Sequence, residues 1–214
     1  MAVAALNYIT EEEYLAKEEG AAEKHEYLAG RVYAMAGGTP EHAQISNNVG
    51  RELSNLAEGT GCIVYSSDLR IKVETTGLNT YPGISMVCGK LTTTDTKPVA
   101  AINPVLIVEV LSESTPNYDN GDKWSHYQAI PSLRDYLLVW PDRPEVEQYS
   151  RQNDNDACWA YRNTKGLDAE IQVQTLSHEV KMNRIYRDVV FPAAPILRAG
   201  KPHEDDQQSS NGNP

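Results

Sequence analysis

The chain has 214 residues, a hydrophobic content of 40% and a formal net charge of −11. This length suffices for one domain with a sizeable core. A protein that coats DNA passively is normally basic, because neutralising phosphates supplies most of its affinity, so the acidic charge excludes that class. An enzyme that meets DNA through a small basic cleft stays open. No apolar stretch approaches the roughly 20 residues that span a bilayer.

The cysteines and the N-terminus bear on the compartment. Residues 1–6 lack the basic region of a signal peptide. Cys62, Cys88 and Cys158 lie far apart and have no metal-ligand spacing. An odd number of cysteines without a secretion signal predicts reduced thiols. We therefore expect a cytoplasmic protein whose three cysteines are small core residues.

The N-terminal half begins with two recognisable helix starts. Thr10 and Glu13 have the spacing of a capping box. Thr39 is a typical N-cap residue, and Pro40 after it suits the first helical position. The predicted elements are helices at 11–19 and 21–27, a strand at 31–36, a helix from 40 to about 59, strands at 63–74 and 81–88, and a polar loop at 90–103.

The C-terminal half alternates apolar and polar segments. The predicted elements are strands at 104–111 and 135–140 with a helix at 119–129 between them, short antiparallel strands at 146–150, 157–162 and 170–175, and a helix at 182–190. We expect one domain over residues 1–195. Residues 196–214 are rich in Asp, Gln, Ser and Asn, which predicts a disordered polar tail.

Glu109 lies inside the apolar run Pro104-Val-Leu-Ile-Val-Glu-Val-Leu111. Such a run predicts a strand buried on both faces. An unpaired carboxylate there would cost several kcal/mol, so Glu109 needs a metal ion, a cation or a proton as partner. Lys123, on the helix that follows, can supply the cation. A structural Glu109–Lys123 ion pair is one reading, and a metal site is the other.

Several short motifs follow one another along the chain. They include His25-Glu-Tyr-Leu-Ala-Gly30, Ser67-Asp-Leu-Arg70, Tyr81-Pro82, Ile107-Val-Glu-Val-Leu-Ser112, Gly121-Asp-Lys123 with Tyr127, and Asp135-Tyr-Leu-Leu-Val139. In order and spacing they resemble the Uma-type restriction endonuclease family, abundant in cyanobacteria, of the PD-(D/E)XK nuclease superfamily. The resemblance covers about residues 8–190. It implies an α/β fold of the restriction-endonuclease type, with a mixed central sheet flanked by helices.

The resemblance also implies a metal-dependent chemistry. In the family an Asp after Tyr-Pro and a Glu on the next strand bind Mg²⁺, which prefers oxygen ligands. The metal and a lysine then activate water for attack on a phosphodiester. Glu109 matches the strand acid and Lys123 the lysine. Gly83 stands where the Asp is expected, so binding of Mg²⁺ or Mn²⁺ should be weak or absent.

Three further side chains are candidates for this site. Glu26, before the first strand, is expected by family analogy to support catalysis, against the reading of a solvated acid. His42 is expected to contact phosphate or water, although a histidine on an apolar helix face is more often a core residue. Asp68 could replace the missing carboxylate, or could be a surface aspartate. The predicted catalytic set is thus Glu109, Lys123, Glu26 and His42, with Glu109 as metal ligand.

Two main functions follow from these residues. The first is a Mg²⁺-dependent DNA endonuclease impaired at Gly83. The second is a catalytically inactive nuclease fold that serves as a binding or assembly module. A third reading is a nuclease for RNA or small nucleotides, which an acidic surface would tolerate better than long duplexes. By analogy with the family we expect DNA as partner and a homodimer, since cutting two strands favours two-fold symmetry, and no membrane association.

Overall fold

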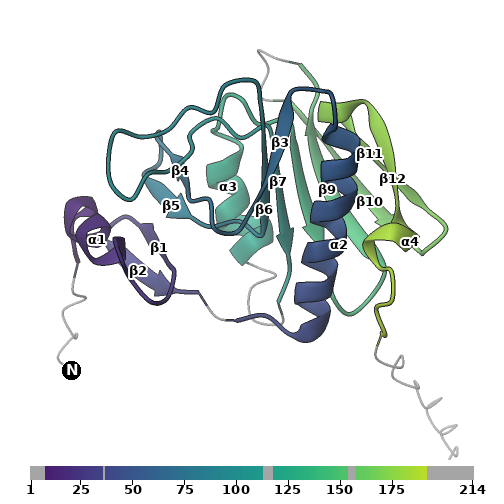
Figure 1. The fold of residues 1–214 in the computed structure, drawn as a ribbon, viewed down its shortest axis with the longest axis horizontal. Helices are drawn as coiled ribbons and strands as arrows, with labels where there is room; N and C mark the ends of the chain where they lie inside the picture. The colour runs from purple at the N-terminus through teal and green to yellow at the C-terminus, as the bar shows by residue number, and fades with distance from the viewer. Residues whose placement is uncertain (1–7, 36, 113–117, 154–157, 192–214) are drawn as a thin grey trace, which may run out of the picture.

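The structure is a computed structural model that describes residues 8–35, 37–112, 118–153 and 158–191. The tail predicted at 196–214 lies outside these residues. Most of the chain forms a mixed α/β fold around one large sheet (Figure 1). None of the helices in the described ranges is long and apolar enough to cross a membrane.

Six strands form the central sheet, in the order β10-β9-β8-β7-β6-β3. They are β3 (Cys62–Ser66), β6 (Ile84–Cys88), β7 (Leu106–Val110), β8 (Asp135–Val139), β9 (Glu145–Arg151) and β10 (Trp159–Lys165). Only β7 and β8 run parallel, while the other neighbours are antiparallel. The predicted mixed sheet is confirmed. The parallel pair requires a crossover, which the helical segment between β7 and β8 supplies.

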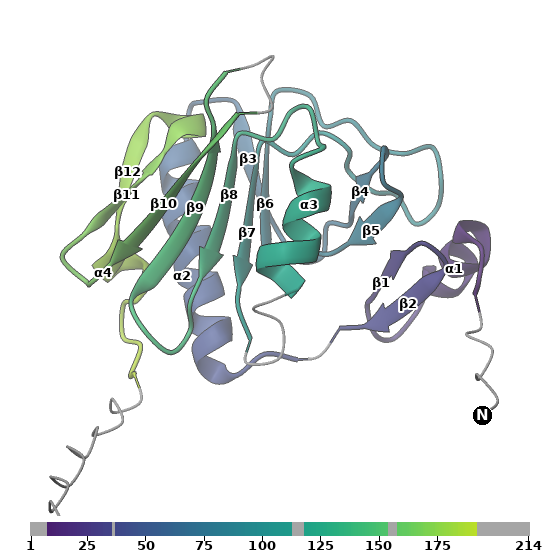
Figure 2. The same ribbon diagram turned by 180° about the vertical axis from the view of Figure 1, so that it is seen from behind.

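Each face of this sheet is covered by different elements. Helix α2 (Pro40–Ala57) packs on one face together with the hairpin β11 (Glu170–Val173) and β12 (His178–Lys181) and the short helix α4 (Met182–Ile185). The opposite face carries the π-helical segment η1 (Tyr118–Lys123), which continues into α3 (Trp124–Tyr127). The two views in Figures 1 and 2 show α2 and α3 on opposite sides of the sheet.

Strand β7 is buried on both faces, as predicted. All five of its residues are buried. Val108 packs in the α2 cluster and Ile107 in the α3 cluster. Because side chains alternate along a strand, Glu109 points to the α3 face.

The N-terminal part forms a second, four-stranded sheet in the order β2-β1-β5-β4. Its elements are helix α1 (Glu11–Glu18) and strands β1 (His25–Leu28), β2 (Arg31–Ala34), β4 (Ile71–Val73) and β5 (Leu78–Thr80). The Thr10–Glu13 capping box before α1 is confirmed. The predicted helix at 21–27 is wrong, because His25 to Leu28 pair with β2. The turn between them places Ala29 and Gly30 at positive φ, which matches the twist of a two-residue hairpin.

The long strand predicted at 63–74 is also wrong. It is divided into β3, in the central sheet, and β4, in the N-terminal sheet. A turn around Asp68 separates the two. The strand predicted at 81–88 is shorter, because β6 begins at Ile84 and β5 occupies 78–80. The even alternation of apolar residues therefore concealed a change of sheet.

The expectation of three reduced, buried cysteines is wrong. Cys62 of β3 lies directly opposite Cys88 of β6, with the Cα atoms 3.9 Å apart, and the two form a disulfide. Cys158 is free and exposed. The pairing depends on the antiparallel register of β3 and β6, which the 26-residue sequence separation does not reveal.

Candidate active site

Glu109 and Lys123 meet beneath the helical segment that follows β7. The Glu109 side chain comes from the sheet and Lys123 from the end of η1, and Lys123 Nζ lies 3.2 Å from Glu109 Oε1. Their side chains are only 9% and 7% exposed. At this depth solvent screens the pair little. The predicted contact between the buried acid and the lysine is thus present.

Glu26 joins the same cluster from the N-terminal sheet. Lys123 Nζ lies 2.8 Å from Glu26 Oε1, and both side chains are 7% exposed. Glu26 reaches this position from strand β1, not from the helix expected there. Lys123 therefore bridges two buried carboxylates from two different sheets.

Thr80, at the end of β5, fixes Glu26. Tyr27 of β1 pairs with Asn79 of β5, which places Glu26 opposite Thr80 one residue further along. Thr80 is fully buried, and its hydroxyl donates to Glu26 Oε1 at 2.5 Å. A hydrogen bond from a neutral hydroxyl to a carboxylate is among the stronger ones. Thr80 thus keeps the carboxylate of Glu26 beside the lysine.

Tyr127 holds the carboxylate of Glu109 in place. It follows Lys123 by four residues, so the two side chains lie on the same side of the helical segment. The Tyr127 hydroxyl donates to Glu109 Oε1 at 3.0 Å and lies 3.5 Å from the hydroxyl of Thr80. Complete burial, followed by the charges of Glu109 and Glu26, raises the pKa of Tyr127 well above 10.0. The phenol therefore stays protonated and acts as a hydrogen-bond donor.

Gly83 contacts Glu109 through its backbone. Ile84 pairs with Val108, so Gly83 lies at the next position, opposite Glu109. Its amide donates to Glu109 Oε2 at 3.2 Å. Gly83 does not adopt a positive φ, and a Cβ built there would lie 3.3 Å from the backbone oxygen of Val108. An L-residue therefore needs no unusual backbone conformation there, only a shift of a few tenths of an ångström.

The residues present do not form a complete magnesium centre. Glu26 and Glu109 are two carboxylates, but Gly83 provides no third. Across the described ranges, no group of three or more His, Cys, Asp or Glu side chains is placed to hold a metal ion. Both Glu109 oxygens accept hydrogen bonds, and the cation between the two acids is Lys123. In this arrangement Lys123 provides the positive charge that a metal would provide.

His42 and Asp68 are the two remaining candidate side chains. His42 is in the first turn of α2, where its amide donates to Thr39. That end of α2 lies at the same end of the sheet as the carboxyl end of β7 in both views (Figures 1 and 2), and the role of His42 stays a prediction. Asp68 forms an ion pair with Lys24 at 2.6 Å and its side chain is 83% exposed. Asp68 therefore matches the surface reading.

Sequence reasoning missed Thr80 and the role of Tyr127. Neither is in the predicted catalytic set. Tyr127 is fully buried, and its hydroxyl contacts Glu109. The one sequence signal for this contact is the spacing of four residues from Lys123. Thr80 has no comparable signal, because its contact with Glu26 depends on the pairing of β1 with β5.

Comparison with known proteins places this fold in a class. A restriction-endonuclease-like family, Uma2, described as putative restriction endonuclease, matches residues 11–184. A crystal structure of a putative nuclease of DUF820 from Anabaena variabilis superposes with a TM-score of 0.68. The match covers 83% of this chain and 97% of that one, at 17% identity, and so concerns the fold.

Two uncharacterized proteins from Synechocystis are similar over most of the chain. The protein slr1290 is 36% identical over 183 residues, which cover 86% of this chain and 94% of the relative. The protein sll1609 is 32% identical over 172 residues, which cover 80% and 96%. The chain belongs to the Uma2 family and has its nuclease-like fold.

Proposed function

We propose that this chain is a DNA endonuclease of the metal-dependent type whose hydrolytic centre is strongly impaired. The observation that carries the proposal is the convergence of Glu26, Glu109 and Lys123 in one buried cluster. Two carboxylates and a lysine brought together from two sheets are the parts that metal-assisted phosphodiester hydrolysis uses. The family description as restriction endonuclease supports the same reaction class.

The impairment follows from Gly83. It lies opposite Glu109, at the place where a carboxylate would complete the metal site, and offers only its amide. A missing ligand should lower metal affinity and cleavage by orders of magnitude. Lys123 and Tyr127 meanwhile satisfy Glu109, so binding a metal would also require these contacts to rearrange.

The contacts of Lys123 favour a second candidate, an inactive nuclease fold that binds or assembles. Removing one partner from a buried ion cluster is costly. Glu26, Glu109 and Lys123 could therefore be retained for stability alone. In either case the proposal includes a cytoplasmic location, DNA as partner and a homodimer. Light scattering of the purified protein would test the homodimer.

Cleavage of supercoiled plasmid in Mg²⁺ or Mn²⁺ separates the two candidates. The proposal predicts weak nicking by the unaltered protein, loss of that nicking in Glu109→Gln, and a gain of orders of magnitude in Gly83→Asp. No cleavage by any of the three proteins, each shown to be folded by circular dichroism, would reject the endonuclease and favour the binding module.

A further inference from the structure

Three tyrosines form a row across the central sheet on the face that carries α3. Tyr136 of β8 pairs with Tyr149 of β9, and Tyr149 pairs with Tyr161 of β10. Directly paired residues point to the same face of a sheet. The ring centroids are 6.2 Å apart for the first pair and 5.2 Å for the second. The row runs from fully buried Tyr136 to Tyr161, which is 54% exposed.

Trp124 of α3 connects this row to the acid cluster. Its ring stacks on Tyr149 at 4.2 Å and contacts the edge of Trp159 at 4.8 Å. Tyr136 in turn touches Tyr127, the residue that donates to Glu109, with centroids 5.2 Å apart. The aromatic side chains are therefore packed in a continuous series from the buried Glu109 cluster to the exposed strand β10.

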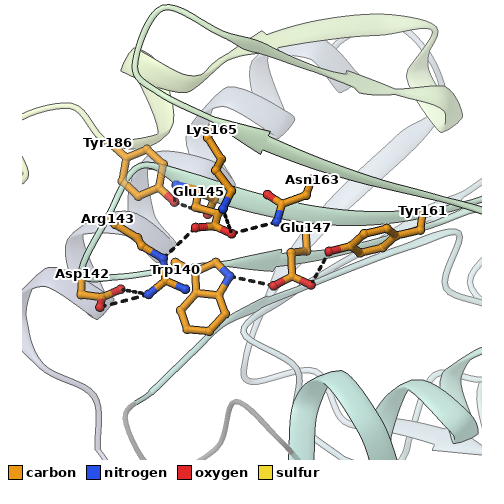
Figure 3. A network of polar contacts seen from close by, with 9 residues as sticks. All are labelled: Trp140, Asp142, Arg143, Glu145, Glu147, Tyr161, Asn163, Lys165 and Tyr186. Atoms are coloured by element: carbon orange, nitrogen blue, oxygen red, sulfur yellow. Dashed lines mark hydrogen bonds and ion pairs between the residues drawn. The ribbon is translucent and has the colours of Figure 1, made fainter.

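Glu147 connects Tyr161, at the exposed end of this row, to a further ring, Trp140. Figure 3 shows Trp140 and Tyr161 on either side of Glu147. Trp140 Nε1 and the Tyr161 hydroxyl each donate to Glu147 at 3.0 Å. The Arg143 guanidinium lies 3.5 Å from the centroid of the Trp140 ring. The carboxylate of Glu147 thus holds two aromatic side chains in fixed positions.

Two exposed cations lie beside these rings. The Arg143 and Lys165 side chains are 41% and 66% exposed, and both contact Glu145. Arg143 also contacts Asp142. The ammonium and guanidinium groups are therefore accessible to the phosphates of a bound strand.

The position of Tyr161 relative to Glu109 suits one extended ligand. Glu109 pairs with Leu138, and Leu138 pairs with Glu147, whose partner on β10 is Asn163. Tyr161 is thus three strands away from Glu109, about 15 Å at the usual spacing of strands. A few nucleotides of an unpaired strand span this distance.

We propose that the face around Tyr161 binds single-stranded DNA, with a base stacked on the Tyr161 ring and phosphates near Arg143 and Lys165. Fixed aromatic rings beside exposed cations are how sequence-independent single-strand binding is achieved. The choice of DNA rests on the proposed function, whereas the binding itself does not require the acid cluster to cleave anything.

Fluorescence anisotropy of a labelled oligothymidylate of about twenty nucleotides, measured in EDTA with the full chain, tests this inference. Tyr161→Ala should weaken binding about 5- to 150-fold, the loss of one stacked base. Tyr161→Phe keeps the ring and should bind within about twofold of the unaltered protein. The matched control is Tyr33→Ala, which removes a 42% exposed tyrosine from another strand, β2, and should not change binding.

Three results would overturn the inference: no binding of oligothymidylate, equal losses in Tyr161→Ala and Tyr33→Ala, or binding of a duplex of the same length as tight as that of the single strand. Tighter binding of oligouridylate would overturn the choice of DNA. Because the assay contains no metal, binding without plasmid cleavage would uphold this inference and reject the proposed function. Cleavage without single-strand binding would do the reverse.

Discussion

The backbone amide of Gly83 donates a hydrogen bond to Oε2 of Glu109 at 3.2 Å. In the proposed function, a carboxylate at this position would complete a metal site with Glu109, whereas the glycine offers only its amide. The other oxygen of Glu109 is held by Lys123 and Tyr127. Glu109 is therefore held by an ammonium group and by hydrogen bonds. Each contact gives a separate prediction.

Lys123→Met should destabilise the protein by about 3 to 5 kcal/mol, because it leaves two buried carboxylates without their cation. Urea unfolding at neutral pH measures the change. The matched control is Lys72→Met, whose ion pair with Glu11 is more exposed, at 19% and 34%, and should cost about 1 kcal/mol or less. Equal losses in the two variants would contradict the importance of the buried cluster.

Thr80→Val should lower the free energy of unfolding by about 1.5 to 3 kcal/mol, because the charged carboxylate of Glu26 loses the hydrogen bond from the Thr80 hydroxyl. Valine has nearly the same shape as threonine, so packing should change little. Chemical unfolding of the variant gives the value. Thr96→Val removes an exposed hydroxyl contact to Thr94 and should change stability by about 0.5 kcal/mol at most. If Thr80→Val were as mild, Thr80 would not be holding Glu26.

The raised pKa of Tyr127 predicts a loss of stability at alkaline pH. The phenol ionises near pH 10 in the unfolded chain but well above it in the folded one. Its contribution is complete below pH 10 and is lost as the pH rises further. Between about pH 9 and 11, the slope of unfolding free energy against pH should become less steep in Tyr127→Phe, by up to about 1.4 kcal/mol per pH unit. Identical slopes would contradict the assignment.

The Cys62–Cys88 disulfide closes a segment of 26 residues, so reduction should lower stability by about 3 to 4 kcal/mol on a chain-entropy estimate. Urea unfolding with and without reductant measures this loss. The double variant Cys62→Ser with Cys88→Ser should not respond to reductant. Before reduction, iodoacetamide should label only the exposed Cys158. Labelling of all three thiols in the native protein would show that the disulfide is absent.

The helix signals and the apolar runs of this sequence were sufficient for most of the fold. The capping box at Thr10 and the N-cap at Thr39 placed α1 and α2, and the run around Glu109 placed β7. Local sequence signals failed where the pairing of strands determines the structure. His25 to Leu28 form a strand only because β2 returns against them, and the apolar alternation over residues 63–74 gave no sign that β3 and β4 join different sheets.

In the candidate site too, local sequence signals predicted some contacts, whereas contacts that depend on strand pairing were missed. The contact of Glu109 with Lys123 followed from burial, because a charge in an apolar strand needs a partner. Glu26 was named by family analogy, and its element was predicted wrongly. Thr80 could not be found, because its contact with Glu26 arises from the pairing of β1 with β5, distant in sequence. The disulfide was missed for the same reason.

Isothermal titration of Mn²⁺ into the unaltered protein, Gly83→Asp and Gly83→Ala tests the account most directly. The account predicts binding that is weak or absent in the unaltered protein and in Gly83→Ala, and that becomes tighter by orders of magnitude in Gly83→Asp. Adding Glu109→Gln to Gly83→Asp should abolish the gain. Tight binding by the unaltered protein, or no gain in Gly83→Asp while it remains folded, would contradict the claim that Gly83 and Lys123 stand in place of a metal centre.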